Sequence, residues 1–143
     1  KACQANRERA GKPFEFSGKT IAGEDLTQKN YQGKSYLIEV LDQNEENSLR
    51  HHNLIKNMAN KNGLNLLTVS TMNTNSLKKF AEQNKIEWPC IPDGGPLLAK
   101  IQFTLAPGFI LVGENGNVIV SGCRLSNLER GLTQLLPGPK KQD

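Results

Sequence analysis

The chain has 143 residues, of which 36% are hydrophobic and 22% are charged, and its formal net charge is +4. This amount of apolar material supports one ordinary core, so the composition excludes a disordered chain and indicates a single domain. The basic residues are scattered, without a basic stripe or a recognisable module, which argues against a nucleic-acid partner, and no apolar run is long enough for a membrane span.

The chain is expected to form one domain between two polar ends. Residues 1–10 are predicted to be a flexible lead-in, residues 11–136 the domain, and residues 137–143 a tail that proline and glycine keep out of the preceding helix. The sequence opens on Lys1 instead of methionine, which suggests that it was cut from a longer precursor. Oligomeric state and partner identity do not follow from these features.

The first elements are predicted from alternation and from one apolar run. Phe14–Phe16 has apolar residues two apart, as in a short strand, and Thr20–Ala22 is expected to pair back with it across a turn at Ser17–Lys19. Tyr36–Leu41 is apolar except for Glu39. Such a run predicts a central strand that is buried on both faces.

The middle of the chain predicts a helix, a strand and a second helix. The first helix is expected from Glu46 to Asn62, with Gly63 as its C-cap, and the strand over Leu64–Val69. Thr74 or Ser76 is expected to cap the second helix.

The last third of the chain predicts an extended segment, a short helix, a hairpin and a final helix. These elements are Trp88–Pro92, Asp93–Phe103, Phe109–Val112 with Val118–Val120, and a helix capped by Ser126. Parallel strands from the β-α-β start and antiparallel strands from the hairpin predict an α/β sandwich with a mixed sheet.

Three segments occur in an order that matches a known pattern. Gly11–Phe16 is similar to a G-x-P-x-P-x-F opening, Leu26 followed by Tyr31–Lys34 to L-x-x-x-x-G-K, and Pro107 with the strand after it to a cis-proline and its P-T-x-x-x-I-D-x-x-G-x-I strand. Together they resemble the thioredoxin-like superfamily, of the TlpA and redoxin (AhpC/TSA-like) type. The resemblance implies a thioredoxin-like α/β/α sandwich with a mixed central sheet and an N-terminal β-hairpin.

The resemblance also implies kinship with bacterial thiol-disulfide oxidoreductases, which are usually exported to the periplasm, and it implies no cofactor. Counted from Gly33-Lys34, the two cysteine positions of the family's C-x-x-C motif fall on Glu45 and Ser48. No cysteine lies between Cys3 and Cys90, so no small shift of the alignment recovers one, and a peroxidatic cysteine at this helix is excluded as well.

Thiol exchange needs a thiolate at a helix N-terminus and a second thiol that resolves the mixed disulfide. A carboxylate cannot attack a disulfide, and a serine without an adjacent base is too weakly acidic to do so. We therefore expect a redox-inactive domain that acts as a binding or structural module of a larger exported protein.

Several roles stay open at this stage. Glu45 and Ser48 are expected to satisfy the amides of a helix start, or else to form a polar recognition patch, and Pro107 to shape its loop or to offer an edge to an extended peptide. An alternative activity is thiol-disulfide exchange or peroxide reduction through Cys90, resolved by Cys123 or an outside thiol. A Cys90–Cys123 disulfide is also open, and binding of the basic domain to an acidic surface ranks third.

The two histidines, His51 and His52, are adjacent in the predicted helix. Neighbouring helical residues point about 100° apart, so these rings cannot face one ligand. We expect each of them on a surface or half-buried helix face, and we expect no metal site.

Overall fold

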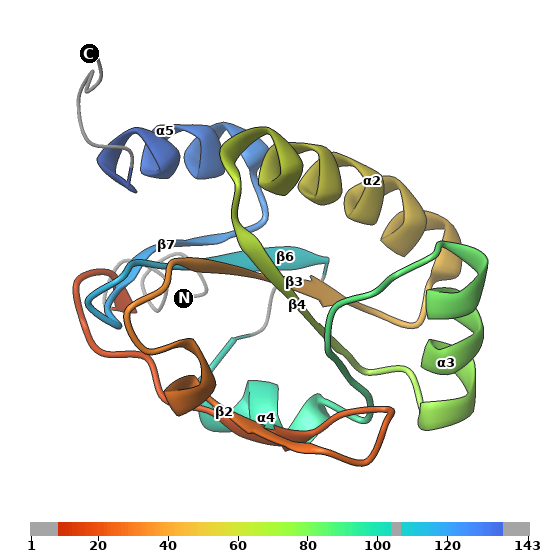
Figure 1. Ribbon diagram of the computed structural model, residues 1–143. Coiled ribbons are helices and arrows are strands. Elements are labelled where there is room, and N and C mark those ends of the chain that lie inside the picture. The colour runs from red at the N-terminus through yellow and green to blue at the C-terminus, as the bar shows by residue number, and fades with distance from the viewer. Residues whose placement is uncertain (1–8, 104–106, 136–143) are drawn as a thin grey trace.

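The structure is a computed structural model that describes residues 9–103 and 107–135. The described chain forms a mixed sheet of five strands, in the order β5-β4-β3-β6-β7, and a separate two-stranded hairpin, β1-β2 (Figure 1). The elements are β1 Ser17–Lys19, β2 Asp25–Thr27, the short 3-10 helix η1 Gln28–Tyr31, β3 Tyr36–Leu41, α2 Glu45–Asn62, β4 Asn65–Ser70, α3 Thr74–Gln83, β5 Cys90–Ile91, α4 Gly95–Lys100, β6 Gly108–Val112, β7 Val118–Gly122 and α5 Leu125–Leu135.

The sheet has a covering layer on each face. Helices α2 and α5 lie together on one face, and the β1-β2 hairpin and α4 lie on the other (Figure 1). β3 runs parallel to β4 and antiparallel to β6, so it is the central strand, and all six of its residues are buried. The predicted α/β sandwich with a mixed sheet and an N-terminal hairpin is confirmed.

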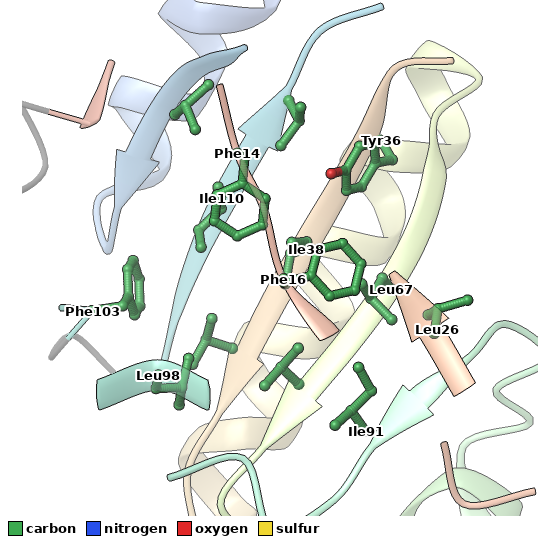
Figure 2. Close-up of a cluster of buried hydrophobic side chains, with 14 residues drawn as sticks. Phe14, Phe16, Leu26, Tyr36, Ile38, Leu67, Ile91, Leu98, Phe103 and Ile110 are labelled. Carbon is green, nitrogen blue, oxygen red and sulfur yellow. The ribbon is translucent and has the colours of Figure 1, made fainter. Parts of the chain in front are cut away.

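Burial on both faces of β3 places one hydrophobic core on each side of the sheet, and a third cluster packs Leu41, at the end of β3, against α3. On the hairpin side, Ile38 and Ile110 pack with Phe14, Phe16 and Leu98, which Figure 2 shows. On the helix side, the sheet residues contact α2 and α5. The helix-side core contains Leu37, Ile55, Ala59, Leu66, Phe109, Leu111, Leu128 and Leu132. The continuous apolar run of β3 is therefore explained by two cores that share one strand.

The central elements begin and end within about a residue of the prediction, but the N-terminal hairpin does not. Ser17–Lys19 was expected to be a turn and is β1, and its partner is β2 at Asp25–Thr27, not Thr20–Ala22. Phe14 and Phe16 alternate because they reach into the core from an extended segment, and near them the described residues form an isolated β-bridge between Pro13 and Asn117.

The helix caps correct two further expectations. Asn73 caps α3 by accepting a hydrogen bond from the Ser76 amide, so neither Thr74 nor Ser76 is the cap. Helix α5 begins at Leu125, which places Ser126 inside its first turn. Gly63 ends α2 with a φ of 64°, as predicted, because glycine adopts this left-handed conformation without steric cost. The expected tail over residues 137–143, and all but the end of the expected lead-in, lie outside the described residues.

Candidate functional site

At the start of α2, where the resemblance places the family's cysteines, nearby polar side chains accept hydrogen bonds from the backbone amides. Asn44 is the N-cap, and its Oδ1 accepts a hydrogen bond from the Asn47 amide at 3.0 Å. Asp42 in turn accepts one from the Asn44 amide at 3.0 Å. Glu45 and Glu46 occupy the first turn and are exposed, a position where carboxylates interact favourably with the helix dipole.

Ser48 is fully buried and serves a different purpose from a cap. Its Oγ donates to the Asp42 carbonyl at 3.0 Å and lies 3.2 Å from the Asp42 Oδ1 atom. Its hydroxyl thus ties the first turn of α2 to the end of β3. The expectation that Glu45 and Ser48 lie at the helix start agrees with this geometry, but the side chain that caps the helix is Asn44, which sequence reasoning missed.

The Pro107 loop lies beside the first half of α2. Gly108, the next residue, pairs with Val40 in the antiparallel register of β3 and β6. The Nε2 atom of His51 lies 2.8 Å from the Gly108 carbonyl oxygen, to which its N–H donates. Burial lowers the pKa of His51, which keeps the ring neutral near pH 7. The peptide bond that precedes Pro107 involves a residue outside the described part, so its predicted cis form stays a prediction.

Cys90 is placed where its thiol is inert. It lies in β5 with 1% of its surface exposed, and burial raises the pKa of its thiol to about 12. Its Sγ makes a weak contact with the Trp88 carbonyl at 3.6 Å. A reactive cysteine needs the opposite setting, in which a positive neighbour or a helix start stabilises the thiolate.

Cys123 cannot pair with Cys90. Cys90 is on one edge strand of the sheet, and Cys123 follows the strand at the other edge. Four inter-strand spacings of about 4.8 Å place them roughly 19 Å apart, whereas a disulfide requires Cα atoms within about 7 Å. The disulfide left open by the sequence is therefore excluded. Cys123 is exposed and follows β7 at the end of the sheet where β3 leads into α2, two strands away from β3.

A buried polar network lies beneath α2, between that helix and the sheet. The Nδ1 atom of His52 lies 2.9 Å from Glu39 Oε1 and 2.8 Å from Glu39 Oε2. The Glu39 carboxylate also accepts a hydrogen bond of 2.6 Å from the Thr68 hydroxyl. The Trp88 indole donates to the Thr68 oxygen at 2.8 Å. Glu39, His52 and Thr68 have no exposed surface, and the partly exposed Trp88 forms the outer end of the network.

Both histidines correct the sequence prediction, because His51 is 8% exposed and His52 is buried completely. They do face different partners, as their helical geometry requires: the Gly108 carbonyl for one and the Glu39 carboxylate for the other. A signal for the second pair was present in the sequence. A lone carboxylate within an otherwise apolar strand needs a buried donor, which the sequence indicates without saying which of the many donors of the next helix supplies it.

The arrangement offers neither thiol chemistry at α2 nor a metal centre among residues 9–103 and 107–135. Over that part of the chain no cluster of three or more histidine, cysteine or acidic residues has a geometry that could hold a metal ion. Within the same ranges no helix has both the length and the apolar character that crossing a membrane demands.

Comparison with solved structures agrees with this fold. A thiol:disulfide interchange protein from Bacteroides sp. superposes with a TM-score of 0.69 at 20% identity, over 92% of this chain and 93% of that one. The thioredoxin domain of a thiol-disulfide oxidoreductase from Bacteroides vulgatus gives 0.63 at 18% identity, over 90% and 98%. A DsbF homologue from Corynebacterium diphtheriae gives 0.70 at 14%, over 87% and 86%.

No protein-family model matches the sequence, and no curated protein matches it. At the identities of the structural neighbours the likeness establishes the fold, which is thioredoxin-like.

Proposed function

We propose that this domain is a redox-inactive member of the thioredoxin-like superfamily, which serves as a binding or structural module of a larger exported protein. The observation that carries the proposal is the start of α2. Its two positions that resemble the family's cysteines hold an exposed carboxylate, Glu45, and a buried hydroxyl, Ser48, that is bonded to Asp42.

The chemistry of these side chains supports inactivity. Transfer of a disulfide requires a sulfur nucleophile that attacks one sulfur and releases the other as a thiolate. Neither Glu45 nor Ser48 can form that mixed disulfide, because neither carries sulfur, and the Ser48 hydroxyl is buried and held by the carbonyl and the carboxylate of Asp42.

A binding role is supported by what the site retains. Gly108, which follows Pro107, lies beside α2, and the start of that helix exposes polar residues such as Gln43 and Glu46 together with the apolar Leu49. The Gln43 side chain donates to the Thr71 carbonyl and so joins this surface to the end of β4. A polar partner segment could contact this surface without any covalent step.

The test is reduction of insulin by dithiothreitol with and without the domain. We expect no acceleration above the dithiothreitol background, with an active thioredoxin-like oxidoreductase as the positive control. Turnover comparable to that of the control would contradict the proposal. Repeating the assay with Cys90→Ser and Cys123→Ser then tells which thiol is responsible.

A gain-of-function variant tests whether the scaffold around the site is intact. Glu45→Cys/Ser48→Cys places two thiols at the N-terminus of α2, where the helix dipole and amides lower a thiol pKa below its usual value of about 8.5. The matched control is Asn57→Cys/Asn60→Cys, which has the same spacing on exposed positions nearer the C-terminal end of the helix. We expect insulin reduction by the first variant only. Equal insulin reduction by the two variants would show that the start of α2 does not make its thiols more reactive than thiols elsewhere on the helix.

The alternative activity through Cys90 has less support. Its thiol is buried, and its pKa of about 12 leaves almost no thiolate at neutral pH. A peroxidase assay on the parent and on Cys90→Ser tests it directly. Peroxide consumption that is lost in the variant would favour this alternative.

A further inference from the structure

A cavity lies at the end of the sheet opposite the start of α2. It is a cavity of about 250 Å³ between the beginning of β3, the 3-10 helix η1 and the turn that joins β6 to β7. β3 enters at this end with Tyr36 and leaves at the other end with Leu41, so the cavity and the α2 site are separated by the length of the strand.

One of the residues that line the cavity has a buried hydroxyl without a hydrogen-bond partner. Tyr36 is 2% exposed, and its Oη atom makes no hydrogen bond in the described structure. Tyr36 and Phe14 both line the cavity, and Figure 2 shows the hydroxyl directed toward the side on which Phe14 lies. A buried hydroxyl is expected to be satisfied, so an unpaired one that borders a cavity indicates a missing donor or acceptor there.

Aromatic rings form one wall above this hydroxyl. Tyr31 stacks on Tyr36 with ring centroids 4.2 Å apart and planes inclined by 18°. Burial raises the pKa of Tyr31 to about 12 and raises that of Tyr36 as well, so both phenols are neutral at physiological pH. Neutral phenol rings present a negative face to a cation, and a neutral phenol oxygen accepts hydrogen bonds.

The charged groups of the cavity have one sign. Glu15 and Glu114 both line it and are both exposed, and the remaining polar side chains there are amides, with no lysine or arginine among the lining residues. This contrasts with the chain as a whole, which has a net charge of +4. The local field therefore disfavours an anionic ligand and favours a cation.

We propose that this cavity binds a small organic cation with a primary ammonium group. An ammonium carries three N–H donors and no acceptor, so it can donate to the Glu15 and Glu114 carboxylates and to the unpaired Tyr36 oxygen while it lies against Tyr31. The volume is at the small end for ligand pockets, which fits an aliphatic amine of a few heavy atoms. This site is independent of the function proposed for α2.

The experiment is a titration of the domain with putrescine at constant ionic strength, followed by amide chemical shifts. The neutral diol of the same length and an equal amount of sodium chloride are the matched probes. We expect saturable shifts around Tyr31–Tyr36 and Glu114–Asn117 with putrescine alone. Equal shifts with the diol or with salt would overturn the proposal, as would shifts that do not saturate.

Three variants test the individual contacts. Glu15→Gln and Glu114→Gln are each expected to weaken putrescine binding about two- to fivefold, as for a solvent-exposed ion pair. Tyr36→Phe keeps the ring in the core and is expected to weaken binding roughly tenfold, because it removes a hydrogen bond to a charged group. Glu24→Gln, an exposed position outside the cavity, is the control and should bind like the parent.

Two results with these variants would contradict the proposal. One is unchanged affinity in both glutamine variants. The other is a Tyr36→Phe domain that is more stable than the parent and binds putrescine equally well, because the hydroxyl would then be unpaired without serving a ligand. Thermal melts of each variant show whether the domain is folded before it is titrated.

Discussion

The buried network beneath α2 gives the sharpest stability prediction. Glu39 and His52 are without exposed surface, and the Nδ1 atom of His52 contacts both carboxylate oxygens of Glu39. Removing either residue leaves the other buried without its partner. We therefore expect Glu39→Leu and His52→Leu to be strongly destabilising when made singly and to compensate each other when they are combined.

The structure sets the size of each effect. Glu39→Leu removes the acceptor of two buried donors, His52 and Thr68, each of which costs about 1–3 kcal/mol when left unpaired, so the expected loss is about 2–6 kcal/mol. His52→Leu leaves the Glu39 carboxylate with Thr68 as its remaining donor, and breaking such a pair costs about 3–5 kcal/mol. Apolar replacement of a buried pair is often close to neutral, but the double variant still leaves the Thr68 hydroxyl without its acceptor, so its expected loss is about 1–3 kcal/mol and well below the sum of the single losses.

The measurement is urea unfolding followed by far-UV circular dichroism. Domains of this size have urea slopes of about 1–3 kcal/mol/M, so a loss of about 4 kcal/mol lowers the midpoint by roughly 2 M. The exposed pair Lys19–Asp25, 3.0 Å apart, is the control, and Lys19→Met should change the free energy of unfolding by no more than about 1 kcal/mol. If the losses of the two buried single variants simply add in the double variant, the residues are not coupled and the reasoning is refuted.

Three further predictions concern other parts of the fold. Burial lowers the pKa of His51 in the folded state, so the unfolded chain binds a proton at His51 first as the pH falls. The free energy of unfolding therefore decreases when the pH falls below the ordinary histidine pKa of about 6.5. The difference between urea midpoints at pH about 7.5 and about 5 should shrink in His51→Gln, and an unchanged difference would locate the effect elsewhere. Iodoacetamide should alkylate Cys123 in the folded protein and leave Cys90 unmodified, even at pH about 9, as peptide mass spectrometry would show; comparable labelling of both thiols would mean that Cys90 is accessible. Gly131→Ala should lower the melting temperature because the new Cβ would overlap the Val120 side chain, although alanine favours helices over glycine by about 1 kcal/mol. Adding Val120→Ala should restore part of the lost stability. A Gly131→Ala domain that melts at a higher temperature than the parent would contradict the predicted clash.

The sequence predicted best where one physical signal dominates. Tyr36–Leu41 is a continuous apolar run, and only a strand with a core on each side accommodates it, so β3 was placed correctly. Gly63 follows a long polar-apolar helix pattern and adopts the left-handed cap. In both cases the local preference and the tertiary environment favour the same conformation.

The prediction of the N-terminal hairpin was wrong because the alternation of apolar residues there comes from packing against the core and not from strand pairing. Phe14 and Phe16 are two residues apart because both enter the core, and an extended segment can do this without a strand partner. The ladder forms at Ser17–Lys19, whose polar side chains carry no strand pattern. His52 was missed for a related reason: its burial depends on Glu39, a pairing across thirteen positions that helical geometry alone does not reveal.

The start of α2 explains how a domain with the thioredoxin-like fold can be stable without thiols at this helix. The Asn44 side chain satisfies an orphan amide of the first turn, the carboxylates there complement the helix dipole, and Ser48 joins that turn to β3 through Asp42. None of these tasks needs sulfur. Hydrogen bonds and charge at the helix start therefore hold α2 against the end of β3 with the side chains that this chain supplies. The Glu45→Cys/Ser48→Cys variant should consequently fold with a free energy of unfolding within about 1–2 kcal/mol of the parent, the main cost being the lost Ser48 hydrogen bond.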